Sequence, residues 1–127
     1  DVAKQAIEQI GDGVQRVFVQ GARACADVVA IAHAVRSSTA LLSLNLYFSC
    51  SELRGAQAIA EAIADHTPRL RYLEMEGNRI GAIGAVRIGR ALSANTTLLM
   101  LNLRSNGIGS DGMAEIATGL AGNTCLR

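Results

Sequence analysis

Aromatic side chains are scarce in this chain of 127 residues: Trp is absent, and aromatic residues make up 3% of the sequence. Half of all residues are hydrophobic, so the core must be built from the aliphatic side chains of Leu, Ile, Val and Ala. Such a share of hydrophobic residues excludes a disordered chain. No uninterrupted apolar stretch approaches the roughly 20 residues that a membrane helix needs, and we therefore expect no membrane partner.

An excess of charge of one sign is also lacking. Lys and Arg number 12, Asp and Glu number 11, and the net charge is +1. Binding to phosphates usually needs a basic surplus, so this balance argues against nucleic acid as the main partner. The three cysteines, Cys25, Cys50 and Cys125, form neither an even disulfide set nor a C-x-x-C metal pair. They indicate reduced thiols in an intracellular, cytoplasmic compartment.

An internal repeat is the strongest signal in the sequence. From Leu70, apolar residues lie at offsets 0, 3 and 5, and Asn78 lies at offset 8. Leu98, which lies 28 residues after Leu70, begins the same pattern again, with Asn106 in the asparagine position. An earlier copy has Ser49 in that position. Repeats start near residues 14, 41, 70, 98 and 126, of which the first is weak and the last is cut off at once.

A second apolar pair, with a spacing of four residues, recurs between these segments. A spacing of four places both members of a pair on one face of a helix. Each unit is therefore predicted to contain a short strand, a loop and a helix. The pairs are Ala3/Ile7, Ile31/Val35, Ile59/Ile63, Ile88/Leu92 and Ile116/Leu120.

The pattern L-x-x-L-x-L-x-x-N resembles the leucine-rich repeat signature. The segments 78–81 and 106–109, both N-x-I-G, together with later glycines and asparagines, resemble the ribonuclease-inhibitor-like subclass. That subclass has 28-residue repeats and occurs in NOD-like receptors and Ran GTPase-activating proteins. The resemblance implies an α/β leucine-rich repeat solenoid of about four and a half repeats, with parallel inner strands and outer helices. Residues 1–127 would then form a single domain that is a fragment of a longer array.

Several residues of the unit have predicted structural roles. Asn78 and Asn106 fall where a strand ends, and a buried amide there can bond backbone groups that are otherwise unpaired. Asn95 and Asn123 follow helices, where a residue that tolerates the left-handed conformation is common. Small size at a crowded helix start explains the recurring glycines, which are Gly55, Gly84 and Gly112.

Two loops depart from the pattern. Residues 65–69 contain the only proline, Pro68, and one residue more than the equivalent turns, which predicts a bulged outer turn. Ser49 and Ser51 replace the expected Asn and Ile, so this loop is predicted to be less well packed than its neighbours.

The strand residues between the inward leucines are predicted to face an open concave surface, because side chains alternate along a strand. Three of the four aromatic residues fall in this set, with polar residues around them, which suits protein recognition. The alternative is that these side chains simply cover the sheet. The predicted partner-binding residues are Arg16, Phe18, Gln20, Ser43, Asn45, Tyr47, Tyr72, Glu74, Glu76, Met100, Asn102 and Arg104.

Catalysis, a metal site and a cofactor are not expected. Glu74 and Glu76 lie close together, but an acid–base pair needs a pocket that gives the two carboxyls different environments. The only histidines, His33 and His66, have no Cys or Asp partner at ligand spacing. A locally basic stretch is interpreted as a solvated outer surface, with an acidic partner as the alternative. Its residues are Arg69, Arg71, Arg79, Arg87 and Arg90.

We therefore predict a non-enzymatic scaffold that presents a rigid concave face to a protein partner, so that little conformational entropy is lost on binding. The resemblance leaves two alternatives. These are a GTPase-activating protein of the Ran-activator type and a ligand-sensing segment of a NOD-like receptor. Apolar residues at 7–10 and 120–126 also predict end-to-end self-association of the isolated chain.

Overall fold

The computed structural model describes residues 2–21, 25–49, 52–65 and 69–126. Within these ranges four short strands form one parallel sheet in the order β1-β2-β3-β4. The strands are β1 (Arg16–Phe18), β2 (Ser43–Asn45), β3 (Tyr72–Glu74) and β4 (Met100–Asn102). The helices are α1 (Val2–Gly11), α2 (Cys25–Ser37), α3 (Glu52–Asp65), α4 (Gly81–Ala94) and α5 (Gly109–Ala121).

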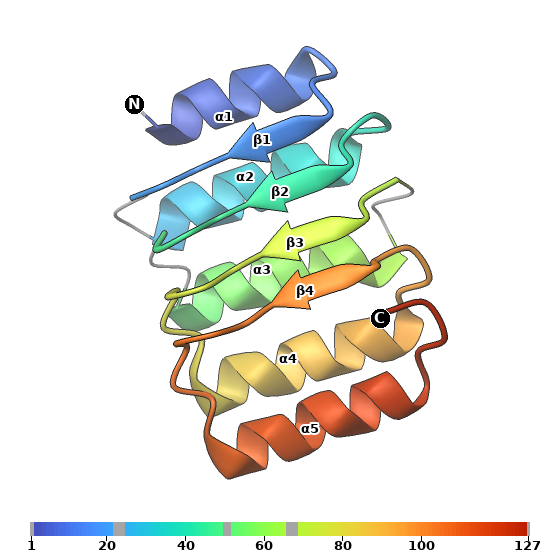
Figure 1. Cartoon of the computed structure of the whole chain (residues 1–127). Coiled ribbons are helices and arrows are strands. Elements are labelled where there is room, and N and C mark those ends of the chain that lie inside the picture. Colours follow the sequence, from blue (N-terminus) through green and yellow to red (C-terminus); the bar gives the residue numbers. More distant parts are fainter. Residues whose placement is uncertain (1, 22–24, 50–51, 66–68, 127) are drawn as a thin grey trace.

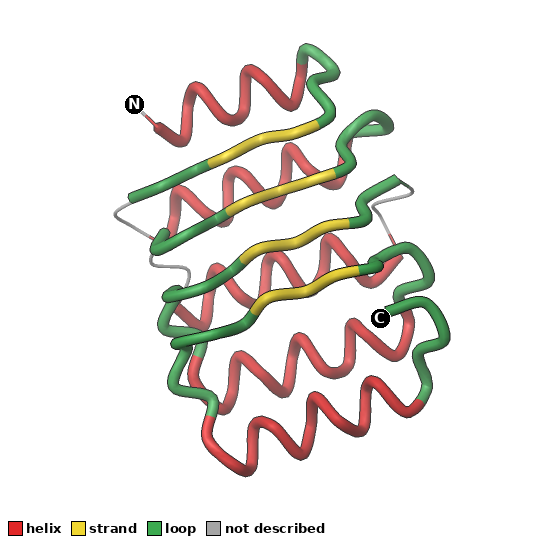
Figure 2. The backbone as a smooth tube through the Cα atoms, in the orientation of Figure 1, coloured by secondary structure: helices red, strands yellow, loops and turns green. Residues whose placement is uncertain are grey.

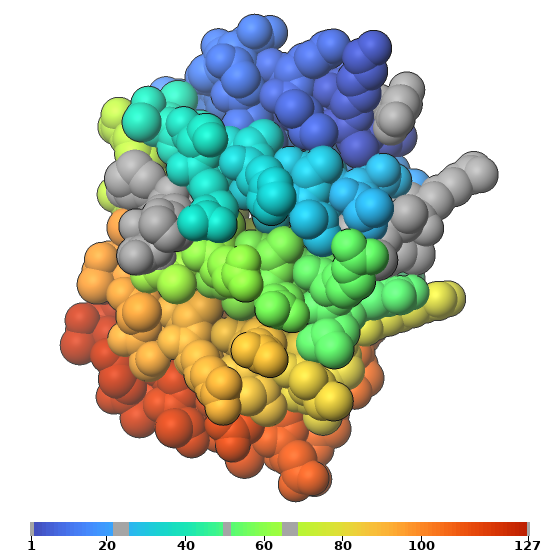
Figure 3. All heavy atoms as spheres, turned by 180° about the vertical axis from the view of Figure 1, so that it is seen from behind, coloured from blue at the N-terminus to red at the C-terminus, as the bar shows by residue number. Residues whose placement is uncertain are grey.

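All the described helices lie behind one face of the sheet, and the other face is open (Figure 1). Strands and helices alternate along the chain, with a loop at each junction (Figure 2). Seen from behind, successive segments of the chain form stacked bands, in sequence order from the N-terminal to the C-terminal end of the molecule (Figure 3). The predicted mixed α/β architecture with parallel strands is confirmed.

The core is aliphatic, as the composition predicts. The central strand residues Leu44 and Leu73 and the helix residues Ile59, Ile88 and Leu92 belong to one buried cluster. Because parallel strands here have helices on one face only, their side chains alternate between this core and the open face.

Val14, predicted as the first inward position of the first repeat, does not belong to this core. It is 37% exposed, and its backbone N–H donates to the carbonyl of Gln9 at 3.1 Å. That bond holds Val14 in the turn after α1 rather than against the sheet. The first inward strand residue is Val17, which is 2% exposed.

The predicted structural role of Asn78 and Asn106 is confirmed. Asn106 Oδ1 accepts from the backbone N–H groups of Asn78 (2.8 Å) and Ile80 (3.3 Å), and its Nδ2 donates to the carbonyl of Met75 at 2.8 Å. Asn78 Nδ2 donates to the carbonyl of Leu46 at 2.7 Å. Both side chains are buried, so each amide joins its own turn to the preceding unit.

Ser49, in the equivalent position one unit earlier, also bonds its own turn to the preceding unit. Its hydroxyl donates to the carbonyls of Val19 (3.2 Å) and Tyr47 (3.3 Å), and the side chain is fully buried. The prediction of looser packing is therefore wrong at Ser49 itself, because the hydroxyl is small enough to be enclosed. Ser51 and Pro68, to which the loop predictions also refer, lie outside the described residues.

The asparagines after the helices act through their side chains and not through a left-handed backbone. Asn95 has φ −74° and ψ 133°, so the left-handed prediction is wrong there. Its Oδ1 accepts from the N–H groups of Thr97 and Leu98, and its Nδ2 donates to the carbonyl of Ile63 at 2.6 Å. Asn123 lacks a positive φ as well and bonds the next turn in the same way.

The predicted need for a small residue near the helix start is confirmed at Gly84. A Cβ there would lie 2.5 Å from Cγ2 of Ile80 and 3.3 Å from Cβ of Ala56. A Cβ at Gly112 would clash with Ile108 in the same manner. The glycines therefore let each helix approach its own loop and the preceding helix.

We expect Asn106→Ala to lower the free energy of unfolding by about 1–3 kcal/mol, because buried backbone groups lose their partner. Asn45→Ala is the matched control, since that half-buried side chain accepts only the N–H of Tyr47 (3.0 Å) within the described part of the chain. Its expected loss is below about 1 kcal/mol. Urea unfolding followed by circular dichroism measures both, and equal losses would contradict the structural role of Asn106.

Candidate functional site

The open face consists of the twelve strand and strand-end residues that the alternation predicts. In β1, β2 and β3 the central residue is buried. Because side chains alternate along a strand, its neighbours belong to the face of the sheet that the helices do not cover. None of the twelve belongs to the core cluster. Exposed members are Arg16, Phe18, Gln20, Tyr72, Met100 and Arg104, and half-buried members are Ser43, Asn45, Tyr47, Glu74, Glu76 and Asn102.

Large side chains are exposed on this face. Phe18 is 61% exposed, Tyr72 is 43% exposed and Met100 is 38% exposed. Tyr72 and Met100 are register partners on β3 and β4, so their side chains lie on neighbouring strands. The open face is therefore apolar in places where solvent would favour polar residues.

Phe48 extends this apolar area, although the alternation of strand residues does not predict it. It is 49% exposed, and its ring lies edge-on to that of Tyr47, with the ring centroids 4.6 Å apart. A Cβ at Gly77 would lie 2.7 Å from atoms of the Phe48 ring, so the ring packs directly over this glycine. Phe48 follows the strand at a turn with φ 48°, where the two-residue alternation no longer applies.

Side-chain hydrogen bonds fix the backbone just beyond three strands. Each bond runs from a backbone N–H to the side chain two residues earlier, and for the asparagines this is a common local bonding pattern. Glu76 N donates to Glu74 Oε1 at 3.0 Å, and Arg104 N donates to Asn102 Oδ1 at 2.9 Å. Tyr47 is held equivalently by Asn45. The strand-end residues of the open face are therefore positioned before any partner binds.

Glu74 and Glu76 are brought together by the neighbouring strand. Asn102 Nδ2 donates to Glu74 Oε2 at 2.8 Å and lies 3.4 Å from Glu76 Oε2. Both carboxylates are half-buried on the same strand face. One amide donor thus joins the two carboxylates, and Glu74 also accepts the backbone N–H of Glu76.

The remaining candidate residues do not converge on a site. His33 is exposed on α2, and His66 lies outside the described residues. Among the described residues no three His, Cys, Asp or Glu side chains are grouped to hold a metal ion. Cys125 is a free thiol, and Cys50 lies outside the described part of the chain. No helix in that part is long and apolar enough to cross a bilayer.

The basic stretch is mostly solvated. Arg71 is half-buried, and its guanidinium lies 3.5 Å from the carbonyl of Thr97. The others are exposed, which fits a solvated surface and an acidic partner equally. These are Arg69, Arg79, Arg87 and Arg90.

Residues 68–89 and 94–117 match the family model described as "Leucine Rich repeat". The match supports a leucine-rich repeat protein. The two matched segments contain β3 with most of α4, and β4 with most of α5. No curated protein matches the chain.

Solved structures share the fold. The chain is similar to the structure of "Leiomodin-1 Actin-Binding Site 2 (ABS2)", with TM-score 0.87 and 23% identity over 99% of this chain and 76% of that one. It is also similar to a tropomodulin C-terminal domain from Caenorhabditis elegans, with TM-score 0.83 and 14% identity over 99% of this chain and 80% of that one. At these identities the likeness shows the fold alone.

Two adjacent residues of β3 test the assignment of the open face. Tyr72→Ala should change the free energy of unfolding by less than about 1 kcal/mol, because the ring is 43% exposed and lies outside the core cluster. Leu73→Ala should lower it by about 2–5 kcal/mol, because the side chain is fully buried. Urea denaturation measures both, and a large loss at Tyr72 would show that its ring belongs to the core.

Proposed function

We propose that the chain is a non-enzymatic protein-interaction scaffold that binds a protein partner through its open face. We place it in the ribonuclease-inhibitor-like subclass of leucine-rich repeats, as a curved solenoid of 28-residue units in which the open face is concave. A cytoplasmic location accompanies this proposal, in keeping with the free thiol of Cys125.

The exposed aromatic residues are the observation that carries the proposal. The chain has two tyrosines, two phenylalanines and no tryptophan. Three of these four rings are at least 43% exposed, and Tyr47 lies against Phe48 at the end of β2. Burial of an aromatic side chain is strongly favourable, so a fold that leaves its few aromatics in solvent has a surface suited to a partner.

The charges of the open face support recognition rather than catalysis. Glu74 and Glu76 lie on or just beyond the inner strand β3, and Arg16 and Arg104 lie on or just beyond the edge strands, so charges of both signs occur along the sheet. Such an arrangement fixes the orientation of a protein partner. The pre-formed hydrogen bonds at the strand ends limit the entropy that binding removes.

Actin is the first partner to test, because one structural neighbour is an actin-binding site of leiomodin-1. A GTPase-activating role would instead appear as faster GTP hydrolysis by a small GTPase in the presence of the chain. Binding of purified actin without faster GTP hydrolysis would support the scaffold. Faster GTP hydrolysis would support the alternative.

Site-specific photo-crosslinking tests the open face whatever the identity of the partner. A photoreactive phenylalanine analogue at Tyr72 should crosslink a partner protein in cells. The same analogue at Ile83, which is 64% exposed on α4, is the matched control on the helix side. Crosslinks from position 83 with none from position 72 would contradict binding through the open face.

An apolar surface beside α5 supports the predicted self-association of the isolated chain. Met113 is 52% exposed and Leu120 is 40% exposed. No described element packs on the far side of α5, and this leaves Leu120 uncovered. A groove of about 330 Å³ runs between these residues and β4. Its apolar lining includes Leu101, Leu103, Ile116 and Leu126.

We expect Leu120→Glu to reduce self-association of the isolated chain, because a carboxylate would be desolvated in the contact. Ile83→Glu adds the same charge to the exposed side of α4 and is the control. Sedimentation velocity across a concentration series measures the effect. A monomeric parent chain, or equal effects of the two variants, would contradict association through the α5 end.

A further inference from the structure

Small residues set the spacing between neighbouring helices on the outer side of the molecule. Between α4 and α5, a Cβ at Gly119 would clash with the carbonyl of Gly89, and a Cβ at Gly89 would lie 2.5 Å from the carbonyl oxygen of Glu115. The backbones of these two helices are therefore in direct contact.

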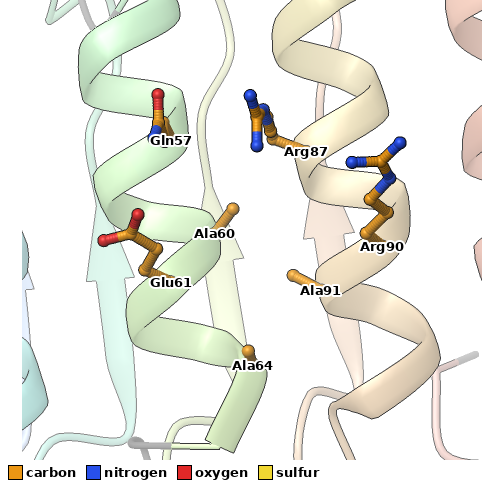
Figure 4. Close-up of a pocket in the computed structure, with 7 residues that line it drawn as sticks. All are labelled: Gln57, Ala60, Glu61, Ala64, Arg87, Arg90 and Ala91. Atoms are coloured by element: carbon orange, nitrogen blue, oxygen red, sulfur yellow. The ribbon is translucent and has the colours of Figure 1, made fainter.

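Alanines stand at the equivalent positions one unit earlier. Ala60 on α3 and Ala91 on α4 correspond to Gly89 and Gly119 in the strand register. Their methyl groups line a groove of about 220 Å³ between the two helices, together with that of Ala64 (Figure 4). The replacement of glycine by alanine accounts for a groove at this place, because methyl groups prevent backbone contact.

Two arginines form the α4 side of the groove. Arg87 and Arg90 are exposed and lie about one helical turn apart. Figure 4 shows both guanidinium groups extending toward the end of the groove at which Gln57 lies, with Arg87 directed toward α3. Glu61, on α3, points away from Arg87. Within the described part of the chain neither guanidinium group has a hydrogen-bond or ion-pair partner.

The size of the groove decides what class of ligand fits. Sites for cofactors and metabolites usually measure about 300–1,000 Å³, and this groove of about 220 Å³ lies below that range, which favours protein side chains as ligands. Guanidinium groups pair with carboxylates through two parallel hydrogen bonds. The alanine methyl groups suit the aliphatic stem of a glutamate. The net charge of +1 gives the chain no basic surplus for a polyanion such as nucleic acid.

We propose that the groove between α3 and α4 docks an acidic segment of a protein partner, which presents two carboxylates about one helical turn apart to Arg87 and Arg90. This surface lies on the helix side of the molecule, so it is separate from the open face and does not depend on the function proposed for that face.

The test is an amide chemical-shift titration of the chain with the capped peptide Ala-Glu-Ala-Ala-Glu-Ala-Ala. The expected result is saturable shifts at Gln57, Ala60 and Ala91 that weaken at high salt. The same peptide with lysine in place of glutamate should give none. Equal shifts with inorganic phosphate alone would overturn the proposal in favour of a simple anion site.

Variants locate the binding. Arg87→Gln and Arg90→Gln should each weaken peptide binding about threefold, and together about tenfold. Arg36→Gln removes the same charge from the exposed side of α2 and should leave binding unchanged. An equal loss with Arg36→Gln, or no loss in the double variant, would overturn the proposal. Loss of binding in Tyr72→Ala would place the peptide on the open face and overturn it as well.

Discussion

The need to satisfy buried backbone groups at the end of each strand governs the arrangement of this molecule. Where the chain leaves β3, the N–H groups of Asn78 and Ile80 both donate to the side-chain oxygen of Asn106 in the following unit. An unpaired buried N–H would cost about 1–3 kcal/mol. Because Asn106 also bonds the carbonyl of Met75, it fixes how the two turns stack. The strand register, and with it the set of outward residues, follows from that alignment.

In the same turn, the residue just before the asparagine or serine adopts the left-handed backbone conformation. Gly77 and Ser105 hold this position before Asn78 and Asn106, with φ of 72° and 56°, and Phe48 holds it before Ser49 with φ 48°. A bulky residue is uncommon in this region and costs about 1–3 kcal/mol. At Phe48 the ring lies over Gly77 and beside Tyr47, which offsets part of that cost. An aromatic ring is thereby held at the open face by a backbone constraint.

The sequence predicts those features that depend on spacing. Inward leucines, alternate outward residues and the buried asparagines all follow from a pattern that returns unit after unit. Prediction from spacing fails where a backbone angle or a neighbouring unit determines the position of a residue, as at Phe48 and at Asn95. Leu120 lies on α5 and is 40% exposed, in keeping with the apolar end that residues 120–126 predict.

The groove between α3 and α4 has the same origin. Ala60, Ala91, Gly89 and Gly119 are all small residues in the sequence, and only the strand register shows which pairs face each other across neighbouring helices. A difference of one methyl group per residue then separates a direct backbone contact from a groove that side chains can enter. Since the asparagines and leucines fix the register independently of these positions, outer residues such as Arg87 can change without moving the open face. The two faces of the molecule are therefore free to carry different specificities on one core.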